Sequence, residues 1–180
     1  MPVFCQAYLI LINPLTPNNN NSQLQTLQLY TNNSTLTTDS QLSTLNSTLQ
    51  VLIDQELLDS LTAQAKTSPR LRMNLDLRNT PADQSQRMLN ALEPGTVMPI
   101  HRHRHTSETV VVLRGKVKWV YYSDKKEVTA TYIVAPGSDL VGLSVPMGQW
   151  HSLECLETGT VIIESKDGPY EPMQEGDVME

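Results

Sequence analysis

Short runs of alternating apolar and polar residues fill the chain from Arg72 onward. They recur at roughly ten-residue spacing and are separated by turn formers such as Pro94-Gly95 and Pro136-Gly137. This alternation is typical of strands with one buried face. The eight runs are RMNLDLR (72–78), QRMLNAL (86–92), ETVVVLRG (108–115), KVKWVYY (116–122), TATYIVA (129–135), LVGLSVP (140–146), WHSLECLE (150–157) and TVIIESK (160–166). They predict a mainly β fold, an antiparallel jelly roll or barrel over residues 70–180.

A helical pattern precedes the strands. Leu57, Leu58 and Leu61 form an apolar stripe behind Asp54, which suits an N-cap, and Ser68-Pro69 ends the pattern. We expect one helix within residues 51–69, packed on the outside of the barrel.

The N-terminal part has a different composition. Asn, Gln, Ser and Thr occupy 25 of the 35 positions from 16 to 50. Such a segment buries too little apolar surface to offset the entropy of ordering. Residues 1–50 are therefore predicted to be a disordered, low-complexity extension, and we assign it no function.

Charge and composition narrow the function. The net charge of -6 argues against a nucleic-acid binder, and no apolar run approaches the ~18 residues that span a bilayer. Cys5 and Cys155 lie too far apart in the sequence to suggest a disulfide framework, and the apolar start lacks a basic region before it. These features predict a cytoplasmic protein that binds neither nucleic acid nor membrane.

The positive charge is concentrated. All seven arginines lie between Arg70 and Arg114, the part of the chain that also holds three of the four histidines. Guanidinium groups bind carboxylates and phosphates in a bidentate way, so this segment suits a small anionic ligand.

The stretch PIHRHRHTSE (99–108) is open to three interpretations: a metal site, a basic binding strip, or a turn with two ligands and a bystander. On an extended strand, His101 and His103 would face one side together. Glu108 opens the next strand, whose tight Arg114-Gly115 end suggests a hairpin, and His151 lies far downstream. Three imidazoles and one carboxylate suit one divalent transition metal ion, Fe, Mn, Ni, Co or Zn. An octahedral ion would keep two positions open for catalysis.

These residues match a known pattern. The first cupin motif, G(X)5HXH(X)3-4E(X)6G, is met at every fixed position: Gly95, His101, His103, Glu108 and Gly115. The second motif is met by Pro146, Gly148 and His151, with two departures. Its first Gly is shifted to Gly142, and Cys155 replaces its final Asn.

From Ile53 to Pro172 the chain also resembles the WbuC family of cupin-fold metalloproteins, within the RmlC-like cupin superfamily. IDQELLDSLTAQA, SPRLRMNLDLRN, DQSQRMLNALEPGT, IHRHRHTSETVVVLRG, PMGQWHSLECLE and KDGPYEP carry the resemblance. It implies a double-stranded β-helix barrel and His101, His103, Glu108 and His151 as metal ligands. It also implies a place in surface-polysaccharide or sugar-nucleotide biosynthesis. Cupins often form homodimers through edge strands, and the strands before the motif are candidates.

Other residues near the motif have two interpretations each. His105 lies where the motif fixes no residue type, so it is either a bystander or the imidazole that moves protons. Arg72, Asn74 and Arg87, on the strands before the motif, either hold an anionic substrate or face solvent or a partner subunit. Cys155 is in phase with His151, so it is either a buried thiol, which we expect, or a residue with a redox or ligand role.

Two classes of function follow. The first is a metal-dependent enzyme acting on a small polar or anionic molecule such as a sugar or sugar nucleotide, by isomerisation or epimerisation. An O2-dependent iron oxygenase is the chemical alternative within this class. The second class is a non-catalytic ligand-binding or regulatory cupin. The metal-independent sugar epimerases of the superfamily lack this ligand set.

Overall fold

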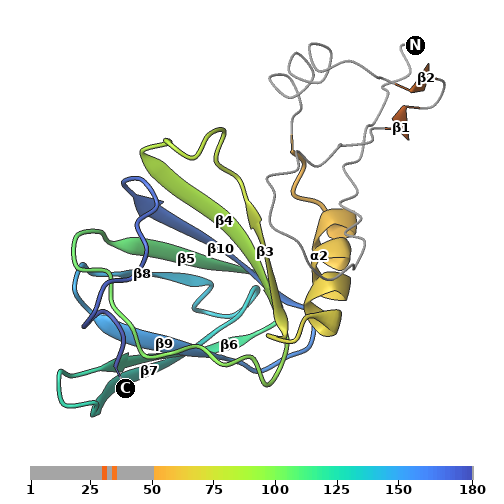
Figure 1. Ribbon diagram of the computed structural model, residues 1–180. Coiled ribbons are helices and arrows are strands. Elements are labelled where there is room, and N and C mark those ends of the chain that lie inside the picture. The colour runs from red at the N-terminus through yellow and green to blue at the C-terminus, as the bar shows by residue number, and fades with distance from the viewer. Residues whose placement is uncertain (1–29, 32–33, 36–50, 180) are drawn as a thin grey trace. The chain divides into compact units, whose positions relative to one another are not determined.

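The computed structural model describes residues 30–31, 34–35 and 51–179 (Figure 1). The chain divides into two units, Met1–Val51 and Leu52–Glu180. In the first unit, β1 (Tyr30–Thr31) pairs antiparallel with β2 (Ser34–Thr35). Apart from these two short strands, residues 1–50 lie outside the described part of the chain. The disorder predicted for them therefore stays a prediction.

The second unit has two antiparallel sheets that face each other (Figure 1). The five-stranded sheet has the order β3-β4-β10-β5-β8, and the three-stranded sheet has the order β7-β6-β9. The eight predicted runs correspond to eight strands, which confirms the mainly β jelly-roll fold. They are β3 (Arg72–Asp76), β4 (Ser85–Leu92), β5 (Glu108–Arg114), β6 (Val117–Tyr122), β7 (Val128–Val134), β8 (Gly142–Val145), β9 (Trp150–Cys155) and β10 (Thr160–Asp167).

Helix α2 (Gln55–Thr67) begins and ends as its sequence predicts. The Asp54 side chain accepts a hydrogen bond of 3.0 Å from the backbone N–H of Leu57, and Ser68 stands before Pro69 at the other end. The helix packs outside the five-stranded sheet, as expected, against β3 and β4 (Figure 1). No helix in the described ranges is long and apolar enough to cross a membrane.

The five-stranded sheet has two unlike faces. Its outer face meets the helix in one apolar cluster, formed by Leu58, Leu61, Ala65, Leu89, Ala91 and Val161. Its inner face contributes Leu92, Val110, Val112 and Ile162 to the barrel core, which also holds Trp119, Leu153 and Cys155 from the other sheet. The predicted burial of Cys155 is confirmed. Because side chains alternate along a strand, each strand serves both faces.

Backbone bonds extend the three-stranded sheet beyond β9. His101 forms an antiparallel bridge with His151 on one side and with Val178 on the other. The N–H of Arg102 donates to the carbonyl of Asp177 at 3.0 Å, and the N–H of Met179 donates to the carbonyl of Ile100 at 2.9 Å. Residues 177–179 therefore lie beside the histidine segment.

The turn at Arg114-Gly115 does not close a hairpin. It carries the chain from β5 in one sheet to β6 in the other, so the hairpin expected from the sequence is wrong. Gly115 has φ 78°, and a Cβ there would lie 2.7 Å from the Cα of Thr160. The last glycine of the cupin motif is therefore required by the crossing between the sheets.

Candidate metal centre

Three separate elements supply the residues of the candidate site. His101 and His103 lie between β4 and β5, Glu108 is the first residue of β5, and His151 is the second residue of β9. The predicted strand through His101 and His103 is absent from this described segment, which forms only the isolated bridge at His101. That bridge, with two backbone bonds of 2.9 Å, fixes His101 directly beside His151.

The four side chains converge. His101, His103, Glu108 and His151 each offer one ligand atom, and these atoms all lie within 4.8 Å of one another. We call these four residues the ligand cluster. Only 3% of the surface of Glu108 and 1% of the surface of His151 is exposed to solvent. The cluster that the cupin motifs predict is thus assembled in space, and it could hold a metal ion.

Backbone carbonyls set the tautomers of two histidines. Nδ1 of His101 lies 3.0 Å from the carbonyl oxygen of Pro99, and Nδ1 of His151 lies 2.9 Å from that of Gln149. A carbonyl oxygen only accepts hydrogen bonds, so in each ring Nδ1 carries the hydrogen. Nε2 then carries the lone pair that a metal ion requires.

The electrostatics agree with this assignment. Burial, together with the neighbouring His151, lowers the pKa of His101 to about 4, and burial also lowers the pKa of His151. Burial alone would raise the pKa of Glu108. Contact with His103 and the charge of Lys166 outweigh that effect, so this pKa lies below its ordinary value. Neutral imidazoles at His101 and His151 and an ionised carboxylate at Glu108 are the forms that bind a cation, and these pKa shifts favour all three.

Two polar atoms of the cluster are buried without a hydrogen bond to any described residue. They are Oε2 of Glu108 and Nε2 of His151, 3.7 Å apart. Oε2 also lies 2.8 Å from Nε2 of His103. Buried polar atoms without partners are costly, and a shared cation would satisfy these two together. The donor atoms present therefore fit a metal ion.

An aromatic ring supports the cluster from the three-stranded sheet. Trp119, on β6, stacks on His151 with ring centroids 5.3 Å apart and planes inclined by 11°. Trp119 is itself almost fully buried, so the imidazole plane is held by core packing as well as by its Nδ1 bond. This contact makes the position of His151 rigid.

The inner face of β10 adds two charged residues that were not predicted from the sequence. Lys166 is paired across the ladder with Glu108, and Glu164 is paired with Val110 on the same face. The side chain of Glu164 lies deep among protein atoms yet keeps some contact with solvent. Burial, together with the Glu108 carboxylate, raises the pKa of Glu164 to about 8. Glu164, an acid with a raised pKa, thus lies diagonally across the strand pair from Glu108.

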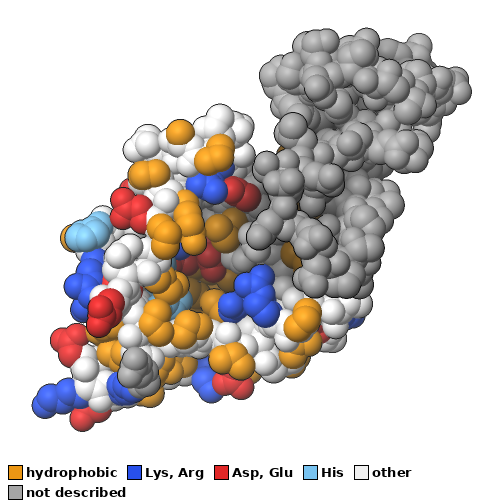
Figure 2. All heavy atoms as spheres, in the orientation of Figure 1, with side chains coloured by type: hydrophobic (Ala, Val, Ile, Leu, Met, Phe, Trp, Pro, Cys, Tyr) orange, Lys and Arg blue, Asp and Glu red, His pale blue; other side chains and the backbone are white. Residues whose placement is uncertain are grey.

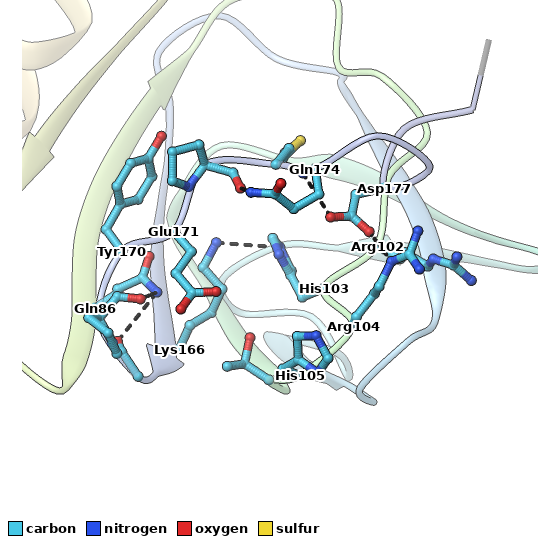
Figure 3. A pocket seen from close by; sticks show the side chains of 15 residues that line it. Gln86, Arg102, His103, Arg104, His105, Lys166, Tyr170, Glu171, Gln174 and Asp177 are labelled. Atoms are coloured by element: carbon cyan, nitrogen blue, oxygen red, sulfur yellow. Dashed lines mark hydrogen bonds and ion pairs between the residues drawn. The ribbon is translucent and has the colours of Figure 1, made fainter.

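A hollow of about 490 Å³ opens beside the cluster (Figure 3). His103 and Lys166 line it together with His105, which is exposed in the turn before β5. Residues 168–177 contribute much of the remaining wall. Elsewhere, Figure 2 shows the surface hollowed over the barrel, with acidic and histidine side chains at depth below apolar ones.

The three predicted substrate-binding residues have different surroundings. Asn74 and Arg72 are paired with Asn90 and Leu92, which places them on the inner face of the sheet. Arg72 donates to the carbonyl of Val97 at 3.1 Å. Arg87 is not brought to the cluster, because its guanidinium contacts Asp83 and the carbonyl of Leu77.

The topology and the motif positions together decide the fold family. The domain has the cupin fold. A family model described as a domain of unknown function, DUF6016, matches residues 53–134. No curated protein matches the chain.

Several solved structures are similar to the chain. KdgF from Halomonas sp. is 15% identical, with a TM-score of 0.47, over 58% of this chain and 85% of that one. Oxalate decarboxylase from Bacillus subtilis, in a study of its Mn(II) centres, is 20% identical, with a TM-score of 0.44, over 56% of this chain and 26% of that one. CapF, bound to the inhibitor 3-isopropenyl-tropolone, is 25% identical, with a TM-score of 0.46, over 55% of this chain and 28% of that one. The matched part thus spans about a quarter of the last two proteins.

Proposed function

We propose that this cupin binds one divalent transition metal ion through His101, His103, Glu108 and His151. We further propose that it is a metal-dependent enzyme acting on a small polar or anionic molecule. One observation carries the proposal: four ligand atoms within 4.8 Å, two of them buried without a hydrogen-bonding partner among the described residues.

The ligand set favours certain ions. Three imidazole nitrogens and one carboxylate oxygen suit Fe, Mn, Ni, Co or Zn better than soft Cu(I) or hard Ca. Bound there, such an ion would supply Lewis-acid chemistry to substrate oxygens.

Proton transfer and substrate binding would require other residues inside the barrel and around the hollow. Glu108 is committed as a ligand, so a different group must hold and move the proton. Glu164 lies on the same inner face as Glu108, and burial raises its pKa, which supports it as that group. His105, the residue that the sequence suggested, is exposed on the rim of the hollow and is better placed to contact substrate there. Asn74 and Arg72 would orient a polar ligand from β3.

The substrate class rests on the family resemblance. WbuC-like residues from Ile53 to Pro172 support a sugar or sugar nucleotide as substrate and a role in surface-polysaccharide biosynthesis. Isomerisation or epimerisation suits that role and needs the proton transfer that Glu164 would provide. The cytoplasmic location and the homodimer stay predictions from the sequence.

Metal analysis tests the proposal. Protein purified without added ions should contain about one transition metal ion per chain. His101→Ala should lose most of this metal and should also lose the rise in melting temperature that added metal gives. At a metal concentration one hundred times the Kd, that rise corresponds to about 2.7 kcal/mol. His105→Ala is the matched control and should retain both.

Two results would contradict the proposal. If no metal co-purifies and added metal leaves the melting temperature of the native sequence unchanged, the metal site is refuted. If metal binds, but no sugar or sugar nucleotide is turned over by the loaded protein while such ligands do bind, the protein is a binding cupin and the enzymatic part fails.

A further inference from the structure

The sequence KDGPYEP (166–172) has a place in the structure that the metal centre does not explain. Lys166 stands near the end of β10, and the chain then turns to form the wall of the 490 Å³ hollow. On the opposite wall is His103, a member of the ligand cluster (Figure 3). The hollow therefore lies between this stretch and the proposed metal.

The wall is firmly attached. Arg102 donates from its guanidinium to the carbonyl of Gly176 at 3.2 Å, and Arg104 forms an ion pair with the buried carboxylate of Asp177. The backbone bonds to Asp177 and Met179 tie the same residues to the histidine segment. The hollow is thus a built cavity between two joined segments. Its volume is in the range of small-molecule sites.

The positively charged side chains that line the hollow differ in the partners they have. Arg104 pairs with the carboxylate of Asp177, whereas Arg102 donates to the carbonyl of Gly176 and lies over the ring of Trp150. Lys166 has no carboxylate within ion-pair distance among the described residues, and its Nζ lies 3.4 Å from Nε2 of His103. A metal ion bound to that nitrogen would occupy its lone pair and leave no acceptor there for Lys166. The ammonium group would then be available to an anion in the hollow.

The other lining residues are suited to hydroxyl groups. Gln86, Thr106 and Gln174 offer amide and hydroxyl groups, and Glu171 offers a carboxylate that accepts hydrogen bonds. Glu171 would repel a second negative charge placed near it. The lining therefore favours a ligand with one anionic end and several hydroxyls.

We propose that this hollow binds a hydroxylated carboxylate or phosphate, such as a sugar acid or sugar phosphate, with its anionic group on Lys166. The inference rests on the proposed metal-dependent function and deepens it by naming the substrate class. It also assigns a role to the KDGPYEP stretch, which walls the ligand in beside the metal.

Calorimetric titration of zinc-loaded protein tests this assignment. The probes are D-glucuronate, D-glucose 6-phosphate and D-glucose, which share a ring and differ in charge. At least one anion should bind about tenfold more tightly than D-glucose, because a charge-assisted contact is added. The tighter of the two distinguishes a carboxylate from a phosphate ligand. Lys166→Met should remove this preference and leave the zinc content unchanged.

Controls keep the outcome unambiguous. Lys118→Met removes a lysine that pairs with Glu154 on the surface, and it should bind the anions as the native sequence does. Lys166→Gln serves as a second variant if Lys166→Met does not fold. Metal content is measured first, since absence of zinc refutes the proposed metal site. In zinc-loaded protein, absence of anion preference, its persistence in the folded Lys166 variant, or loss of zinc from that variant overturns the present inference.

Discussion

The two faces of the five-stranded sheet are made by the same strands but differ in the side chains they carry. Leu89, on the outer face of β4, is fully buried under helix α2, whereas its neighbour Asn90 faces the barrel. On β10, Val161 and Ile163 pack outward, while Glu164 and Lys166 line the interior. The comparison indicates that the outer face carries apolar packing alone where it meets the helix, whereas the inner face combines the apolar barrel core with costly charged groups.

The largest effect is expected from the outer face. Leu89→Ala would leave a cavity in the apolar cluster and should lower the free energy of unfolding by about 2–5 kcal/mol. The metal bound per folded molecule should not change. Chemical denaturation followed by circular dichroism, together with metal analysis, measures both quantities.

Asn90→Ala is the matched variant, one position along the same strand and on the inner face. It removes a polar side chain that contacts Glu164 and should cost less than about 1 kcal/mol. Equal losses for the two variants would show that the faces do not differ in the way we infer.

A smaller, pH-dependent effect is expected from the inner face. The folded pKa of Glu164 is about 8, above its ordinary value of 4.5, so the folded state holds this proton more tightly than the unfolded state. Its contribution to stability is therefore complete below pH 4.5 and is lost as the pH rises toward 8. Because the side chain keeps some solvent contact, the slope should stay below about 1.4 kcal/mol per pH unit.

Glu164→Gln tests this in chelator-treated protein. The groups that act on Glu164 are Glu108, Lys166, Asn90 and Arg72, and all four stay in place in the variant. Between pH 6.5 and 8, the native sequence should lose stability more steeply than Glu164→Gln, as measured by urea titration. Parallel slopes would mean that Glu164 is ionised throughout this range.

The smallest effect is expected where a strand faces solvent. Lys118 on β6 and Glu154 on β9 form an exposed ion pair of 2.5 Å. Pairs of this kind contribute about 0–1 kcal/mol and are screened by salt. Glu154→Gln should therefore shift the urea midpoint only slightly, and less at high salt. A loss comparable to that of Leu89→Ala would remove the distinction between packed and solvated faces.

Much of the fold could be predicted because its signals are local. Alternation identified the eight strands, and Asp54 and Ser68 marked the helix ends. The ligand cluster was also predictable, since the spacing from His101 to Glu108 is short and His151 follows a recognisable turn. What alternation does not provide is the pairing of strands, so the Arg114-Gly115 turn was expected to close a hairpin and instead joins two sheets.

Glu164 and Lys166 were not predicted for the same reason, which is that strand pairing cannot be deduced from alternation. In TVIIESK, alternation alone places Glu164 and Lys166 on one face, which is a signal that could have been used. Only the pairing of β10 with β5 shows that this is the face of Glu108. Arg87 could not be placed either, because its partner Asp83 lies in a loop. The contact of residues 175–177 with Arg102 and Arg104 joins distant parts of the chain and has no local pattern.

The bridge from His101 to both His151 and Val178 has a consequence for biosynthesis. A chain is made from its N-terminus, so His101 leaves the ribosome well before either of its two neighbours. The backbone at His101 is held in place only after residues 151 and 178 have been made and paired with it. The frame of the centre is therefore complete only once Val178 has been made, and a nascent chain that stops before Val178 presents its histidines without the frame that aligns them.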